Sequence, residues 1–439
     1  MLRQSLTASL PGLTLALCAL GLVGYARFVL GYPICPNDEQ NYVAILERLD
    51  QGARWPVSGP AFVFINQLLS RATGLSFAAT VALIGTLAVP VLVFVTYRLY
   101  RSVAGEAKAA FLSVLVLFAS SYFLGPLIES RPQQVGQFLV LAACLALYRR
   151  GQGHHNLAGF AVLYALTASY HILSWAVLTG AALLLWSGRF ALGSVSAASS
   201  WQFLLALLPG LAIVLFPSGP YEVMLLDIRR HHVLLTGEWA LLAGIAILVV
   251  AVLSLLLLRR HATAWPQGIQ RLLAGLGGVP VQIRLVATTA VVALVLTVQY
   301  SLLHERYAAN YADSMLRFLS LQAGNLLFLG LLLWGSLRAM DAYVEARWPT
   351  WLSPFAALGL IFAAMGVVTL LVSPFLLDKN LLIRLMGYAL LFAAPFACYG
   401  LATLPPRLRS LVLLSLPAAA ALSLMHGIKH PAWMVCVPG

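Results

Sequence analysis

Runs of about 20 apolar residues recur along this chain, and they constrain its fold more than any other feature. Each run is long enough to cross a bilayer as a helix. The chain is 61% hydrophobic and only 9% charged, whereas a soluble protein is about 25% charged. The runs are continuous rather than alternating, which does not fit a membrane β-barrel. The sequence therefore predicts an all-α, polytopic membrane protein.

We expect about thirteen membrane-spanning helices, joined mostly by short polar loops. The first run is too long for a secretory signal and is followed by many others, so we expect it to be retained. The predicted spans are residues 9–30, 75–97, 109–125, 132–148, 156–170, 172–187, 201–217, 239–258, 285–303, 319–336, 352–372, 381–402 and 410–425.

Positive charge is divided unequally between alternate loops, and this predicts the orientation. One set of loops holds fifteen Lys and Arg against three acids, while the other holds twelve cations and eleven acids. Cytoplasmic loops carry the excess of Lys and Arg, so the first set is predicted to be cytoplasmic. The N-terminus is then inside and the tail from Met425 outside. The net charge of +13 is a topology signal rather than a sign of nucleic-acid binding.

Arg greatly outnumbers Lys, which is compatible with a bacterial source, and we expect the inner membrane. Three of the five cysteines, Cys18, Cys144 and Cys398, fall inside predicted spans, where we expect them to pack as small apolar residues. Cys35 and Cys436 fall on the predicted outer side. They are either a disulfide pair in an oxidising periplasm or two separate thiols. No Cys-x-x-Cys pair or His cluster indicates a structural metal site.

The longest predicted outer loop, residues 31–74, contains the adjacent acids Asp38 and Glu39. Asn37 is a good helix N-cap, which places both acids in the first helical turn. The apolar residues Tyr42, Ile45, Leu46 and Leu49 follow at helical spacing, which predicts an amphipathic helix on the membrane surface. Residues 61–71 form a second apolar helix that is too short to span. Simple capping on a solvated loop is the alternative interpretation of the two acids.

Several other predicted outer segments place Arg or His close to the membrane edge. An acidic helix head among such cations suits an anionic, lipid-linked substrate. Arginine forks bind phosphate, and a carboxylate can deprotonate an attacking hydroxyl. The alternatives are a snorkelling role for Arg131, a packing role for His171 and an ion pair between Arg384 and Asp378. The segments are residues 127–134, 169–175, 217–232, 302–317 and 378–388.

Five motifs occur in order along residues 31–187: NDEQNYV, SGPAFVFINQLLSRATG, VLVFVTYRLYRSVAGEAKAAFLSVLVLFASSYF, LIESRPQQVGQFLVLAACLALYRRG and LYALTASYHILSWAVL. With these motifs, residues 31–187 resemble the catalytic module of the GT-C-fold glycosyltransferases, particularly the protein O-mannosyltransferases and the lipid A aminoarabinose transferases. RLMGYALLFAAPFACYG, from residue 384, resembles an Arg-headed late span of these enzymes. Many of these enzymes carry a soluble domain, whereas here we expect only the short outer tail 426–439 after the last span.

The resemblance implies inverting transfer of a sugar from a polyprenyl-phosphate carrier to an acceptor hydroxyl on the outer face. Asp38 would be the general base, and Glu39 would orient the acceptor or bind a divalent cation, Mg or Mn. Arg131 and Arg384 would hold the donor phosphate. The acceptor could be a lipid, a glycan or a protein. Further candidates are Arg306 for the phosphate, and Glu129, His171, Arg229 and Arg230 for substrate.

Three regions follow from this interpretation: a catalytic module at 1–190, a variable module at 191–425 that forms the donor's lipid groove, and the outer tail 426–439. Two other functions compete. An O-antigen polymerase or ligase also combines many spans with outer Arg and His, but usually depends on a large late loop. A lipid or solute transporter usually places charges in mid-span and has paired halves, and neither pattern is evident here.

Overall fold

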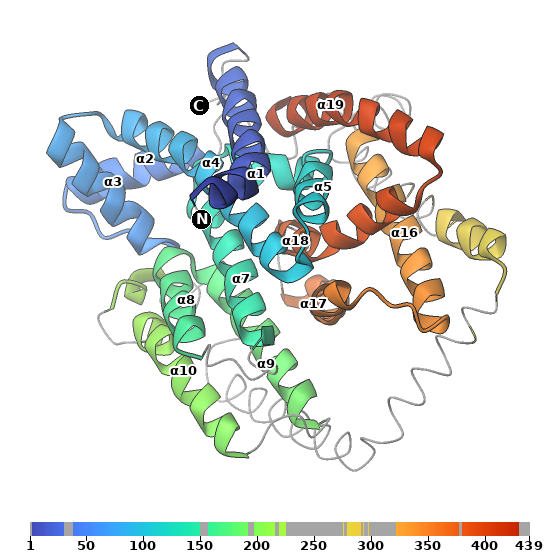
Figure 1. Ribbon diagram of the computed structural model, residues 1–439. Coiled ribbons are helices and arrows are strands. Elements are labelled where there is room, and N and C mark those ends of the chain that lie inside the picture. The colour runs from blue at the N-terminus through green and yellow to red at the C-terminus, as the bar shows by residue number, and fades with distance from the viewer. Residues whose placement is uncertain are drawn as a thin grey trace.

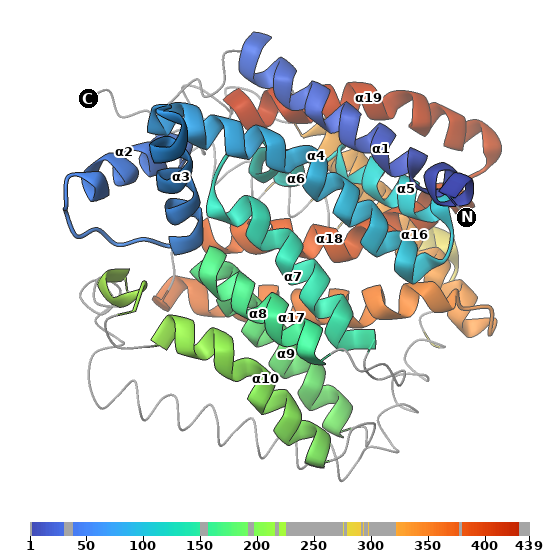
Figure 2. The same ribbon diagram turned by 60° about the vertical axis from the view of Figure 1, so that its left-hand side comes forward.

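The computed structural model describes residues 2–29, 38–149, 157–191, 197–215, 219–224, 275, 279–290, 293, 297, 322–376 and 380–429. Within these ranges the chain is helical and contains no strand. Figures 1 and 2 show the helices as a bundle with α2 and α3 together at one end. The N-terminus lies toward the opposite end in Figure 2. We call the first of these the α2–α3 end.

The helices follow the order of the predicted segments. They are α1 (Leu2–Gly24) with a π-helical turn η1 (Tyr25–Val29), α2 (Asp38–Asp50), α3 (Pro60–Thr73), α4 (Phe77–Ala104), α5 (Ala107–Leu117), α6 (Ser121–Ile128), α7 (Pro132–Arg149), α8 (Leu157–Tyr170), α9 (Ile172–Ala191), α10 (Ala197–Leu215), α16 (Ala323–Val344), the 3-10 turn η4 (Thr350–Leu352), α17 (Ser353–Leu376), α18 (Asn380–Thr403) and α19 (Pro406–Lys429).

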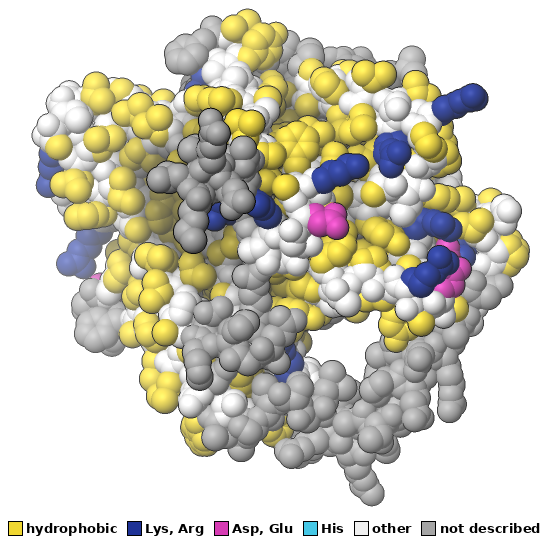
Figure 3. All heavy atoms as spheres, in the orientation of Figure 1, with side chains coloured by type: hydrophobic (Ala, Val, Ile, Leu, Met, Phe, Trp, Pro, Cys, Tyr) yellow, Lys and Arg dark blue, Asp and Glu magenta, His cyan; other side chains and the backbone are white. Residues whose placement is uncertain are grey.

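Six helical segments in the described part are long and apolar enough to cross a membrane. Hydrophobic side chains cover much of the face seen in Figure 3. The prediction of an all-helical, multi-pass membrane protein is therefore confirmed, although thirteen spans are not. The predicted span 239–258 and most of 285–303 lie outside the described residues. The six segments are Ser9–Arg27, Phe77–Ala104, Ile172–Phe190, Ala323–Val344, Leu385–Thr403 and Pro406–Leu424.

The predicted single span 109–125 is instead divided between α5 and α6, which meet at an angle of 84°. Asn325 of α16 supplies the hydrogen bonds that support this break. Its Oδ1 accepts from the Ser120 hydroxyl and from the Ser121 backbone N–H, each at 2.9 Å. Its Nδ2 donates to Ser121 Oγ at 2.8 Å. A break in a helix needs such replacement partners when water is excluded.

The two short helices of the first loop are present as predicted. Tyr42 and Leu46 of α2 are buried against Phe62 and Val63 of α3. The other face of α2, with Glu47, Arg48 and Asp50, is exposed. Glycines with positive φ follow both helices, Gly52 at 82° and Gly74 at 71°, and glycine adopts this conformation without steric cost.

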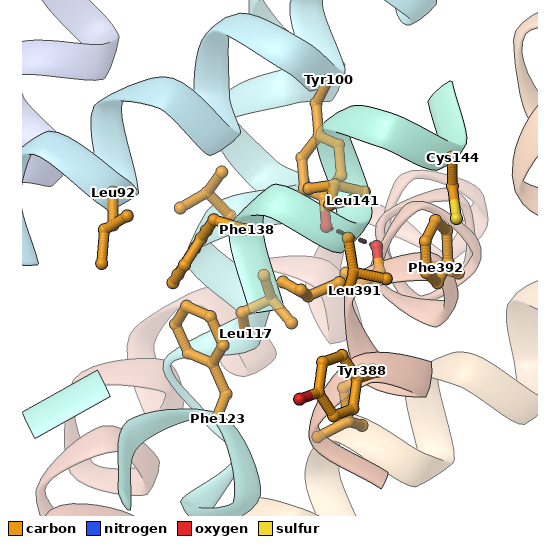
Figure 4. Packing of buried hydrophobic residues seen from close by; sticks show 14 of the residues in the cluster. Leu92, Tyr100, Leu117, Phe123, Phe138, Leu141, Cys144, Tyr388, Leu391 and Phe392 are labelled. Atoms are coloured by element: carbon orange, nitrogen blue, oxygen red, sulfur yellow. Dashed lines mark hydrogen bonds between the residues drawn. The ribbon is translucent and has the colours of Figure 1, made fainter. Parts of the chain in front are cut away.

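The bundle core joins the N-terminal and C-terminal halves of the chain. Figure 4 shows Tyr100 of α4 among core residues of α18, and its hydroxyl donates to the Leu391 carbonyl at 2.6 Å. Cys144 and Cys398 are buried as expected, but Cys18 lies on the exposed face of α1. The hydrogen bond from Tyr100 to Leu391 fixes the position of α4 relative to α18, where the surrounding contacts are apolar.

Glycines allow α16 and α18 to approach closely. A Cβ on Gly335 would lie only 1.8 Å from the Phe396 carbonyl oxygen. We expect Gly335→Ala to lower the free energy of unfolding by about 1–3 kcal/mol, because α18 must move to relieve the overlap. Gly330→Ala on the same helix is the matched control, since its Cβ would meet nothing within 4 Å. Thermal unfolding of both variants in detergent measures the difference, and equal melting temperatures would contradict the prediction.

Candidate functional site

A buried ion pair fastens the start of α2 to the rest of the bundle. Glu39 is 4% exposed, and its two carboxylate oxygens accept from Nη1 and Nη2 of Arg27, each at 2.9 Å. Oε2 also accepts from the Ser130 backbone N–H at 3.0 Å. Arg27 further donates to the Ile128 carbonyl at 3.2 Å. A bidentate pair of this kind fixes orientation as well as distance, so the head of α2 is held against the turn between α6 and α7.

That turn is itself fastened to α4. The Ser130 hydroxyl donates to the Val81 carbonyl at 2.6 Å. Nε2 of Gln134 donates to the carbonyls of Leu127 at 2.6 Å and of Gly85 at 3.1 Å. A Cβ on Gly85 would lie 2.2 Å from Ser130 Cβ, so only glycine permits this approach. The turn is therefore a rigid support for the side chains that it carries.

Arg131 is the cation on this turn. Its side chain is 4% exposed, and its Nε lies 3.0 Å from Oε2 of Glu129, which is also largely buried. A guanidinium in such a place has a low local dielectric, where its attraction for an anion is stronger than in water. Residues Glu129 to Pro132 thus place the Arg131 guanidinium, partly neutralised by Glu129, on the turn that holds the head of α2.

The second helix of the first loop packs against the same turn. A Cβ on Gly59 would lie 2.4 Å from Pro132 Cγ and 2.6 Å from the Tyr170 carbonyl oxygen. The backbone carbonyl of Ser58 accepts a hydrogen bond from the Ile172 backbone N–H at 2.9 Å. The Ser58 hydroxyl is hydrogen-bonded to the Tyr42 hydroxyl. Three sequence motifs that are far apart in the chain therefore meet at the α2–α3 end.

His171 is the single residue between α8 and α9, and it is 4% exposed. Its Nδ1 accepts from the Ser174 backbone N–H at 3.2 Å and lies 2.8 Å from Ser174 Oγ. Because Nδ1 accepts, the neutral ring carries its proton on Nε2. Ser174 Oγ lies 2.6 Å from the hydroxyl of Tyr388 on α18. A polar chain therefore runs from the turn into the bundle.

Tyr221 packs against Ala168 of α8. It is fully buried, and its hydroxyl donates to the Ala168 carbonyl. Burial raises the pKa of this phenol, with a smaller contribution from Tyr42. The group therefore remains a neutral hydrogen-bond donor at physiological pH.

Four of the candidate residues gather at the α2–α3 end: Glu39, Glu129, Arg131 and His171. Asp38 is the first residue of α2, directly before Glu39, and its side chain lies outside what the structure describes. The side chain of Arg384, in the first turns of α18, also lies outside it. The remaining candidates fall wholly outside the described residues: Arg229, Arg230, Arg306, Cys35 and Cys436.

Sequence reasoning missed several polar residues of the site. Arg27 was included in the predicted first span, residues 9–30, without a role of its own. A charged residue inside a span indicates a buried partner. The residues PQQVGQ, from 132, carry three amides in the first turns of an apolar helix, which is a second signal. Ser130, Ser174 and Tyr388 give no signal of their own in the sequence. In the part of the chain described, no three His, Cys, Asp or Glu side chains are grouped as a metal site.

The fold defines the chain as an all-helical, multi-pass membrane protein with a buried polar site at one end of the bundle. No protein-family model matches the chain, and no curated protein matches it significantly.

Proposed function

We propose that the chain is a GT-C-like glycosyltransferase that transfers a sugar from a polyprenyl-phosphate carrier to an acceptor hydroxyl. The observation that carries the proposal is the bond from Ser130 to Glu39 at 3.0 Å. It holds the head of α2, where Asp38 begins the helix, beside the turn that carries Arg131. An acid and a buried cation on one rigid support are what this transfer requires.

Asp38 is the general base in this proposal. Its carboxylate takes the proton of the acceptor hydroxyl as the acceptor oxygen forms a bond to the anomeric carbon. The bond from that carbon to the phosphate oxygen breaks, and the electron pair leaves with the polyprenyl phosphate. Attack opposite the leaving group inverts the configuration. The helix dipole at the first turn of α2 favours the charged carboxylate that the step consumes.

Arg131 stabilises the phosphate as it leaves, because its guanidinium is buried near the site of charge development. Glu129 balances that cation in the absence of donor. We assign substrate contacts to His171, and further phosphate contacts to Arg384. Glu39 positions α2: its carboxylate is neutralised by Arg27, so it does not fit a ligand of a divalent cation.

The proposal places about thirteen spans in a bacterial inner membrane, with the α2–α3 end facing the periplasm. The test is transfer by the purified protein in detergent with radiolabelled polyprenyl-phosphate sugars and an envelope lipid acceptor fraction. We expect release of polyprenyl phosphate together with a labelled product of inverted anomeric configuration. Retained configuration, or no release with any donor, would overturn the proposal.

One observation favours the transporter alternative. The break between α5 and α6, supported by Asn325, is a discontinuous helix of the kind that forms substrate sites in transporters. Vesicles reconstituted with the protein separate the two functions. Movement of the lipid-linked sugar between leaflets without release of polyprenyl phosphate would favour transport.

A further inference from the structure

Two buried amides on α7 contain polar atoms that have no hydrogen-bond partner. Gln133 and Gln137 are each 1% exposed. Among the residues that the structure describes, both Nε2 and Oε1 of Gln133 lack a hydrogen-bond partner, as does Nε2 of Gln137. Nearly all buried polar atoms in proteins are paired, and an unpaired one is costly where water is excluded. These two amides therefore need an explanation that contacts within the described helices do not supply.

The neighbouring Gln134 shows that the bundle can satisfy an amide here. Its Nε2 donates to two backbone carbonyls, those of Leu127 and Gly85. Gln134 therefore has a structural role. Gln133 and Gln137 are four residues apart, so they lie on one face of α7, and Gln134 lies at the edge of that face.

The surroundings of this face are polar, and glycines stand where polar side chains approach the helices. A Cβ on Gly387 would lie 2.5 Å from Nε2 of Gln137, so α18 has glycine where the amide approaches it. The next residue, Tyr388, bonds through its hydroxyl to Ser174. A Cβ on Gly136 would likewise lie 2.1 Å from Ser174 Oγ. The Gln137 amide thus lies beside the residue that precedes Tyr388, and Gln133 lies one helical turn closer to Arg131.

The chemistry of these groups indicates their ligand. An amide offers both a donor and an acceptor and has no charge, so it suits hydroxyl groups better than a phosphate, for which arginine is preferred. We propose that Gln133 and Gln137 bind the hydroxyl groups of the sugar on the lipid-linked donor, while Arg131 binds its phosphate. This inference rests on the proposed function and assigns the sugar subsite within it.

The first test needs no ligand. Gln133→Met and Gln137→Met keep the unbranched shape and remove the unpaired atoms, so each variant is expected to melt at or up to about 2 °C above the wild type. Gln134→Met is the matched control, and it is expected to melt several degrees lower because it removes two buried hydrogen bonds to backbone carbonyls. If the first two variants lose as much stability as the control, the amides are structural and the proposal is wrong.

The second test measures recognition of the sugar. The melting temperature is followed with polyprenyl phosphate alone and with polyprenyl phosphate bearing glucose, mannose or aminoarabinose. At least one sugar-bearing lipid is expected to stabilise the wild type more than the bare carrier. That difference should disappear in the double variant Gln133→Met/Gln137→Met, while stabilisation by the bare carrier remains. Equal stabilisation by all four lipids in the wild type overturns the inference.

The two proposals fail separately in this design. If the amides discriminate sugar-bearing lipid but the wild type releases no polyprenyl phosphate, the proposed transferase function is wrong and the sugar subsite stands. If transfer occurs and the double variant retains both the sugar-dependent stabilisation and full turnover, the subsite is wrong and the transferase function stands.

Discussion

Asp38→Asn is expected to reduce the rate of sugar transfer by about 10²–10⁴-fold, the usual contribution of a general base. Asn has the same shape as Asp but cannot accept the acceptor's proton. The backbone at Asp38 is fixed by the bonds of the next residue, Glu39, to Arg27 and Ser130. We therefore expect the variant to insert and melt as the wild type does. The measurement is release of polyprenyl phosphate under single-turnover conditions.

Asp50→Asn is the matched control for this variant. Asp50 is the last residue of α2, and its exposed side chain forms an ion pair with Arg71 at 3.4 Å. The same chemical change there should leave the rate within about twofold, because a solvated pair contributes little. Full transfer activity in Asp38→Asn would remove Asp38 as the base. An equal loss in both variants would point to a general effect on α2.

Local features of this fold could be predicted from the sequence. The apolar spacing of Tyr42 and Leu46 and the glycine that follows α2 depend only on neighbouring residues, and the structure confirms both. The same holds for α3, whose first residue is Pro60 and which ends before Gly74. The position of His171 between two helices also follows from hydropathy alone.

Long-range partners could not be predicted in this way. The hydrogen bond from Ser130 to Glu39 joins residues 91 apart, and the one from Ser121 to Asn325 joins residues 204 apart. Hydropathy measures the composition of a segment and not the direction in which its chain runs. Residues 109–125 were therefore predicted as one straight span, although the chain turns by 84° between α5 and α6. Arg27 was missed because its partner, Glu39, lies on the next helix, and hydropathy does not identify partners between helices.

The ion pair between Arg27 and Glu39 provides the second large effect. Their side chains are 7% and 5% exposed, so removing one partner leaves a buried charge without compensation. We expect Glu39→Gln and Arg27→Met each to lower the free energy of unfolding by about 3–5 kcal/mol. The double variant removes both charges, so it should be less destabilised than the sum of the two by about 1–3 kcal/mol. Denaturant titrations in detergent give the four values.

Asp50 and Arg71 form the reference pair, because Asp50 lies on α2 as Glu39 does, but the two side chains are 50% and 71% exposed. Arg71→Met should change the free energy of unfolding by no more than about 0.5 kcal/mol. If Glu39→Gln is as mild as this, the buried pair does not hold α2 in place. The position of Asp38 would then lack its support, since the same carboxylate that stabilises the fold also fixes the residue before it. A large coupling energy together with lost transfer in Glu39→Gln would instead show that the anchor of α2 serves both stability and catalysis.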